Sequence, residues 1–82
     1  MVRREDLLAR VRANPQGVRF SDLCALASSY GWILDRQSGS HRIFKRSGHR
    51  QLMNFQDDGG KAMPYQVRQL IRAIDELRPE DA

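Results

Sequence analysis

The sequence predicts an α+β domain in which three antiparallel strands form one sheet and the helices pack on one face of it. Apolar residues recur with helical spacing near both ends of the chain. Between them, three short segments with large apolar side chains follow one another, separated by turns that contain glycine. Short turns favour antiparallel pairing, and helices on one face leave the other face of the sheet for solvent or a partner.

The first element is a predicted short helix over residues 3–13. Its apolar residues form only a narrow stripe, made by Leu7, Leu8 and Val11. Asn14 and Pro15 end it, because proline cannot continue a helix. Such a weak helix is either a docked arm or partly frayed.

A second helix is predicted over residues 21–30. Ser21 suits its N-cap, and Gly31 suits the position just after its C-terminus. Four apolar residues share one face of it: Leu23, Leu26, Ala27 and Tyr30. Cys24, the only cysteine, lies near this face, and we interpret it as a small buried hydrophobe rather than a reactive thiol.

Three strands are expected next, over residues 32–36, 42–46 and 51–55. Residues 38–40 and 47–49 supply the turns, with His49 exposed, and residues 56–61 are expected to form a flexible loop. Two sets of side chains alternate along the second strand: His41, Ile43 and Lys45 on one face, and Arg42, Phe44 and Arg46 on the other. Each face carries one large apolar residue, so the sequence does not decide which face the helices cover.

The closing helix has the clearest pattern, and Pro64 suits its first position. Its apolar stripe consists of Met63, Val67, Leu70, Ile71, Ile74 and Leu77. Its polar side is expected to carry Gln66, Arg68, Gln69, Arg72, Asp75 and Glu76. We therefore expect a single domain over residues 1–82, with an N-terminal helical extension (1–19), a core (20–77) and a loose tail (78–82).

Composition limits the possible function classes. A net charge of +4 and a sequence pI near 10 favour a polyanionic or acidic partner. One cysteine allows no internal disulfide, which fits a reducing cytoplasm. The N-terminus lacks an apolar signal region, and no apolar run approaches the ~20 residues that span a bilayer, so we expect no membrane association.

Residues 36–50 contain no acidic side chain. His41 lies in this cationic stretch, where an imidazole suits an enzyme that acts on a polyanion; an RNA-binding surface with an incidental histidine fits equally well. Six cations are candidate phosphate contacts: Arg36, Arg42, Lys45, Arg46, Arg50 and Lys61. The alternative is a solvated face that keeps a sheet edge soluble.

Several motifs together resemble the HicA toxins of bacterial and archaeal type II toxin–antitoxin systems. They are Gly31-Trp32, Arg36-Gln37-Ser38-Gly39-Ser40-His41-Arg42-Ile43-Phe44, Met53-Asn54-Phe55-Gln56, and the segment from Gly60-Lys61 to Leu70. The resemblance covers about residues 20–77 and implies an mRNA interferase with a double-stranded-RNA-binding-domain-like fold, α-β-β-β-α. It implies that His41 is catalytic and that a HicB antitoxin covers the active surface. The chain departs from the pattern in its extension (1–19) and in Arg42, where many members have a second histidine or an apolar residue.

The chemistry that the resemblance implies needs few groups. RNA carries its own nucleophile, the 2′-hydroxyl, so an imidazole that titrates near pH ~6.5 can move protons while cations stabilise the phosphorane. Gly39 and Ser40 either place backbone N–H groups and a hydroxyl near the phosphate or form a plain hairpin turn. No cofactor is expected, and four possible metal ligands lack a recognisable spacing: His41, His49, Asp57 and Asp58.

We expect the partners to be mRNA and an acidic HicB-type antitoxin. Two rival interpretations remain at this point: a non-catalytic RNA-binding module of the same fold, and a small adaptor whose open sheet face docks a protein.

Overall fold

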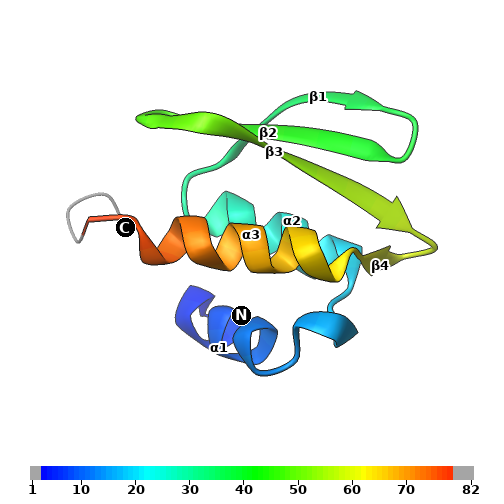
Figure 1. The fold of residues 1–82 in the computed structure, drawn as a ribbon, viewed down its shortest axis with the longest axis horizontal. Coiled ribbons are helices and arrows are strands. Elements are labelled where there is room, and N and C mark those ends of the chain that lie inside the picture. The colour runs from blue at the N-terminus through cyan, green and yellow to red at the C-terminus, as the bar shows by residue number, and fades with distance from the viewer. Residues whose placement is uncertain (1–2, 79–82) are drawn as a thin grey trace.

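The structure is a computed structural model that describes residues 3–78, so the tail expected over residues 78–82 lies outside the described residues except for Arg78. The elements follow in the order α1 (Arg4–Ala13), η1 (Pro15–Gly17), α2 (Phe20–Ser29), β1 (Ile33–Ser38), β2 (His41–Arg46), β3 (His49–Asp58), β4 (Lys61–Ala62) and α3 (Pro64–Asp75). Figure 1 shows three layers: the sheet, then α2 and α3 beneath it, and α1 beneath those two helices. The predicted α+β architecture, with all helices on one side of the sheet, is confirmed.

The sheet has four strands rather than three, in the order β1-β2-β3-β4, with every neighbouring pair antiparallel. The predicted flexible loop over residues 56–61 is largely strand. Gly59 and Gly60, at φ 61° and 91°, make a two-residue turn, which lets the short β4 pair with the end of β3. The second predicted turn is also shorter than expected, because β3 already begins at His49.

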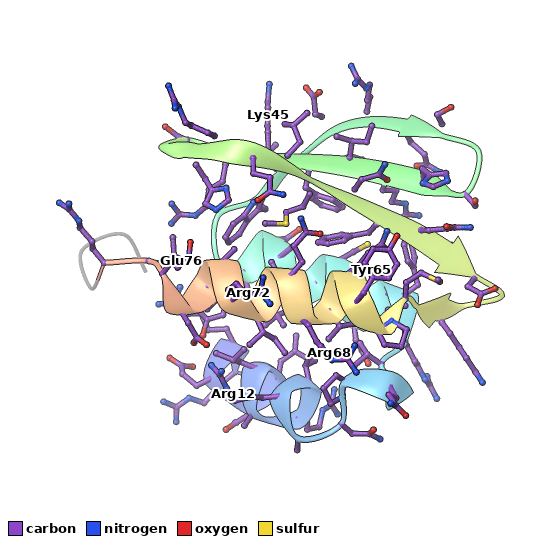
Figure 2. All side chains as sticks on the ribbon, in the orientation of Figure 1. Arg12, Lys45, Tyr65, Arg68, Arg72 and Glu76 are labelled. Atoms are coloured by element: carbon purple, nitrogen blue, oxygen red, sulfur yellow. The ribbon has the colours of Figure 1, made fainter. Side chains whose placement is uncertain are left out.

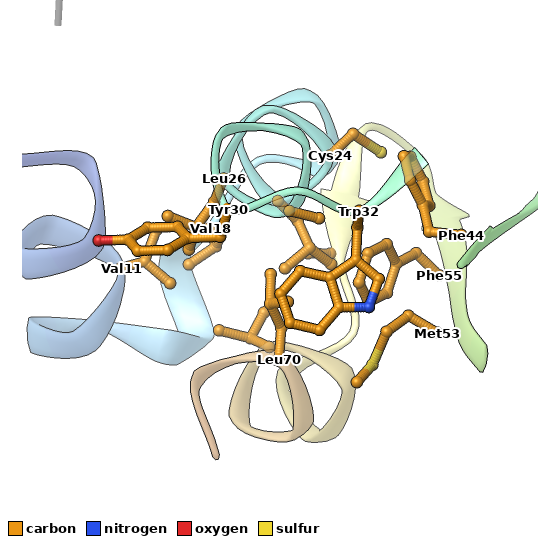
Figure 3. Packing of buried hydrophobic residues seen from close by; sticks show 14 of the residues in the cluster. Val11, Val18, Cys24, Leu26, Tyr30, Trp32, Phe44, Met53, Phe55 and Leu70 are labelled. Atoms are coloured by element: carbon orange, nitrogen blue, oxygen red, sulfur yellow. The ribbon is translucent and has the colours of Figure 1, made fainter. Parts of the chain in front are cut away.

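The hydrophobic core decides which sheet face the helices cover. Phe44 of β2 is 3% exposed, and its register partner Met53 and the nearby Phe55 are 1% and 0% exposed. All three side chains therefore lie on the helix side of the sheet. Figure 3 shows Trp32, Phe44, Met53 and Phe55 between the helices and the strands, whereas Val11, Val18 and Tyr30 lie on the side next to α1.

Helix α2 begins one residue earlier than predicted, at Phe20, and Ser21 is not its cap. The segment before the helix is held by β4 instead: the Phe20 N–H donates to the Gly60 carbonyl at 2.9 Å, and the Ala62 N–H donates to the Val18 carbonyl at 2.9 Å. The predicted C-terminal glycine is confirmed. Gly31 takes φ 97°, and its N–H and that of the next residue bond back to carbonyls of the last turn, as in a Schellman motif.

Helix α3 buries its predicted apolar stripe, with Val67, Leu70 and Ile74 at 0–7% exposed. Gln66 differs from the expectation, because it is only 4% exposed. Its Oε1 accepts the backbone N–H of Gln56 at 2.8 Å, so burial of the amide is compensated by a hydrogen bond that joins α3 to β3.

The N-terminal extension is docked rather than frayed. Leu7 and Val11 are buried, and the Arg12 guanidinium donates two hydrogen bonds, of 2.9 and 2.8 Å, to the Asp75 carboxylate of α3. The guanidinium of Arg4 also lies 4.7 Å from the centre of the Tyr30 ring. Within residues 3–78, no helix is both long and apolar enough to cross a membrane.

Candidate functional site

The sheet face that carries no helix is called the open face here. Strand alternation relative to the buried Phe44, Met53 and Phe55 assigns to it a set of side chains that includes Ile33, Arg36, Ser38, His41, Ile43, Lys45, Arg50, Leu52, Asn54, Gln56 and Asp58. Figure 2 agrees, since Lys45 rises from the sheet away from the helices, whereas Arg68 and Arg72 project from α3 on the other side. The three strands β1, β2 and β3 therefore bring predicted site residues onto one surface.

His41 is the first residue of β2, directly after the hairpin turn. Gly39 takes φ 57° and Ser40 does not have a positive φ, which is the pattern of a type II′ turn. This two-residue turn sets the register, so that His41 faces Ser38 on β1 and Gln56 on β3. The side chain is half-buried, and its Nδ1 lies 3.1 Å from Asn54 Oδ1.

A second cross-strand row lies next to His41 on the open face. It consists of Arg36 on β1, Ile43 on β2 and Asn54 on β3, which pair with one another in the ladder. Arg36 and Asn54 are thus diagonal neighbours of His41 on its two flanks, at a typical spacing of about 7–8 Å between backbones. Arg36 is exposed, and within residues 3–78 its guanidinium has no hydrogen bond or ion pair.

The six candidate phosphate contacts do not lie on one surface. Arg36, Lys45 and Arg50 share the open face with His41, and Lys61 lies on the short β4. Lys45 is partly neutralised, because its Nζ lies 3.3 Å from the Asp35 carboxylate. Arg50 is four residues along β3 from Asn54, or about 13 Å at the usual rise of a strand.

Arg42 and Arg46 lie on the helix side of β2. The Arg46 Nε donates to the Tyr30 carbonyl at 2.7 Å, and its guanidinium lies 5.3 Å from the centre of the Trp32 ring. The hydrogen bond ties the sheet to the C-terminal end of α2, and the ring contact ties it to the segment between α2 and β1. All six cations were predicted as candidate phosphate contacts, and the fold places these two arginines on the face opposite His41.

Arg42 packs against the first half of α2. Its guanidinium lies 5.1 Å from the centre of the Phe20 ring and 4.0 Å from the Cys24 sulfur. The prediction that Cys24 is a buried hydrophobe is confirmed, since the residue is 8% exposed. Burial raises the pKa of its thiol, and the neighbouring Arg42 charge only partly opposes that effect.

The second histidine is not the exposed turn residue that the sequence predicts. His49 begins β3 and is half-buried, with its ring edge-on to Trp32 at 5.5 Å between centres. Its Nδ1 lies 3.0 Å from the Gln51 carbonyl. It therefore occupies the helix side of the sheet, on the opposite face from His41. Residues 3–78 contain no group of three or more His, Cys, Asp or Glu side chains placed to hold a metal ion.

The turn residues Gly39 and Ser40 are exposed beside His41. The Ser40 carbonyl is already occupied, because it accepts the Asp57 N–H at 2.8 Å. That bond extends the β2–β3 ladder by one residue before the start of β2 and holds the turn beside β3.

Sequence reasoning missed one residue at this site, Asn54. No role was predicted for it, although asparagine is depleted in strands and here lies between the apolar residues Met53 and Phe55. A polar amide at an open-face position of a central strand is the signal that identifies it.

One family comparison bears on this site. A family model with the description "HicA toxin of bacterial toxin-antitoxin" matches residues 20–75. The match begins at the first residue of α2 and ends at the last residue of α3, so it includes the whole sheet and leaves α1 and η1 outside. Searches among curated proteins and among solved structures gave no match.

Proposed function

The chain belongs to the HicA family of toxins of bacterial toxin–antitoxin systems, and on that premise we propose that it is an endoribonuclease that cleaves mRNA in the cytoplasm and blocks translation. The reaction needs no metal ion in this proposal, because RNA supplies its own nucleophile. The observation that carries the proposal is the position of His41: a half-buried imidazole on the open face, with Arg36 diagonally beside it.

The proposed reaction is an internal transfer. The 2′-hydroxyl of one nucleotide attacks the adjacent phosphorus while His41 takes its proton. The bond from phosphorus to the 5′-oxygen of the next nucleotide breaks, and the imidazolium returns the proton to that oxygen. The products are a 2′,3′-cyclic phosphate and a free 5′-hydroxyl, with no net change in the protonation of the enzyme.

Arg36 is the cation best placed to stabilise the transition state. Its planar guanidinium can bind two phosphate oxygens at once, and it has no competing partner within residues 3–78. Lys45 contributes less, because Asp35 already neutralises part of its charge. One proton-transfer group gives about 10²–10⁴-fold acceleration. This predicts a slow nuclease, which suffices for a toxin that needs few turnovers.

We also propose that an acidic HicB-type antitoxin covers the open face. The face combines the cations Arg36 and Arg50 with exposed apolar side chains, such as Leu52 at 46% exposed. Carboxylates of the antitoxin would stand where RNA phosphates lie, so one surface would serve both partners, and the net charge of +4 would speed their association.

The test is to incubate the purified chain with a structured mRNA in the presence of EDTA. We expect cleavage by the wild-type chain and by His49→Gln, which retains His41, but not by His41→Ala, with circular dichroism confirming that both variants fold. A gel shift without cleavage would replace the enzyme with an RNA-binding module. Neither cleavage nor a shift would favour the protein-docking adaptor. Equal cleavage by His41→Ala would remove His41 from the mechanism.

A further inference from the structure

Only one ring nitrogen of His41 has a side-chain partner within residues 3–78. The Nδ1 atom lies 3.1 Å from Asn54 Oδ1. A carbonyl oxygen of an amide only accepts hydrogen bonds, so the Nδ1–H of His41 must be the donor. In the neutral ring the proton then resides on Nδ1, and Nε2 carries the lone pair.

We propose that Asn54 is a positioning residue that holds His41 in this tautomer, so that Nε2 is the nitrogen that takes the proton from RNA. The inference rests on the proposed nuclease function and deepens it by assigning the reacting atom. Asn54 acts through the imidazole and need not bond to the transferred proton.

The fold holds the Asn54 amide in place. Its neighbours Met53 and Phe55 are 1% and 0% exposed, and they lock β3 onto the helices. Its register partner on β2 is Ile43, and just beyond it Gln66 accepts the Gln56 N–H at 2.8 Å. A side chain on a strand clamped on both sides presents its amide more precisely than one on a loop.

The surroundings of His41 are suited to a neutral orienting group. The charged side chains on the open face near it are Arg36 from β1 and Lys45 from β2, and Lys45 is paired with Asp35. On β3, the two open-face residues nearest His41 are Asn54 and Gln56, which carry no charge, and the next one, Asp58, has Lys61 of β4 as its register partner. An amide fixes the ring and stabilises the imidazolium less than a carboxylate at the same position would, because the carboxylate adds a full negative charge.

The first test reads the tautomer directly and needs no RNA. Long-range ¹H–¹⁵N spectra of the full chain, recorded at a pH where the ring is neutral, are expected to show His41 protonated at Nδ1 and unprotonated at Nε2. In Asn54→Ala the two tautomers should mix. A wild-type His41 protonated at Nε2 would overturn the inference whether or not the chain cleaves RNA.

The second test uses kinetics. Because Asn54→Ala loses one hydrogen bond of ordinary strength, it should lower kcat about tenfold with little change in KM. Asn54→Asp should shift the pH–rate profile to higher pH, because the carboxylate stabilises the protonated ring. Gln51→Ala is the matched control, since Gln51 lies on the same strand with its side chain on the helix side.

The outcomes distinguish the positioning role of Asn54 from the proposed nuclease function. A wild-type chain that cleaves RNA, together with variants at Asn54 that retain the wild-type kcat and pH profile, would refute the positioning role and leave the nuclease intact. A wild-type chain that does not cleave would refute the nuclease, and the nitrogen spectra would still show whether Asn54 fixes the ring.

Discussion

Replacing Arg46 with alanine is expected to destabilise the fold, although Arg46 belongs to the cationic stretch that the sequence assigns to RNA binding. The variant loses a charge-assisted hydrogen bond of 2.7 Å to the Tyr30 carbonyl and a cation–π contact with Trp32 at 5.3 Å. Such a hydrogen bond contributes about 1.5–3 kcal/mol, and the cation–π contact contributes about 0.5–1 kcal/mol at a partly exposed site. The expected loss is therefore about 2–4 kcal/mol.

That loss is a large share of the total for a chain of 82 residues, because domains of this size have a free energy of unfolding of roughly 4–12 kcal/mol. It corresponds to a fall in Tm of about 8–30 °C. Urea denaturation measures it as a lower midpoint at constant slope. Arg36→Ala is the matched control: it removes the same charge from the open face, and it should change stability by no more than about 0.5 kcal/mol.

RNA affinity should rank the two variants the other way round, because Arg36→Ala should lose more affinity than Arg46→Ala. At a temperature where both are folded, Arg36→Ala should weaken RNA affinity and flatten its dependence on salt, while Arg46→Ala should retain most of the affinity. Equal urea midpoints for the two variants would refute the reasoning, because they would show that Arg46 does not tether the sheet to α2.

Three further predictions follow from the packing and the pKa shifts. Phe55→Ala should lower the free energy of unfolding by about 3–5 kcal/mol, because the ring is 0% exposed; a urea midpoint close to wild type would contradict its central place in the core. Arg12 holds the pKa of Asp75 below its usual value, so the pair stabilises the fold above the unfolded pKa of about 3.9 and loses that effect as pH falls through the lower folded value. Because both side chains are about half exposed, Arg12→Ala should lower the free energy of unfolding by at most about 1 kcal/mol at pH ~7. In strong acid the urea midpoints of the variant and of the wild type should become equal. A difference between the two midpoints that stays constant with pH would exclude this linkage. Burial raises the pKa of the Cys24 thiol, so iodoacetamide should modify it much more slowly in the native chain than in urea, and equal rates in a mass-spectrometric time course would show that it is accessible.

Much of the fold follows from local patterns in the sequence. The closing helix, the apolar face of α2 and the glycine after it were predicted, because helical spacing and a positive φ are properties of a few neighbouring residues. The predictions that were wrong concern features that depend on pairing between segments far apart in the sequence. Helix α2 begins at Phe20 because β4 holds the preceding residues, and β4 itself is too short to have an apolar pattern.

The candidate site was predicted in part. The sequence singled out His41 and the cations around it, but it could not separate Arg36 from Arg42 and Arg46, because charge content alone does not indicate a face. It also gave Gln66 a solvent-exposed position, although its amide is buried as an acceptor for the Gln56 N–H. Asn54 went unnoticed because its partner lies 13 residues away along the chain.

The sequence by itself determined the three helices and the first three strands, the hairpin turn before His41 and the alternation of side chains along β2, since these depend on backbone preferences over a few residues. Only the tertiary structure decided which alternating set faces water. The sequence gives no reason to bury Phe44 rather than Ile43. In the structure, Met53 and Phe55 lie on the same side of the sheet as Phe44, and α2 and α3 cover all three. Burial of apolar surface depends on several segments docking at once, so the same event that buried Phe44 placed His41, Asn54 and Arg36 together on the open face.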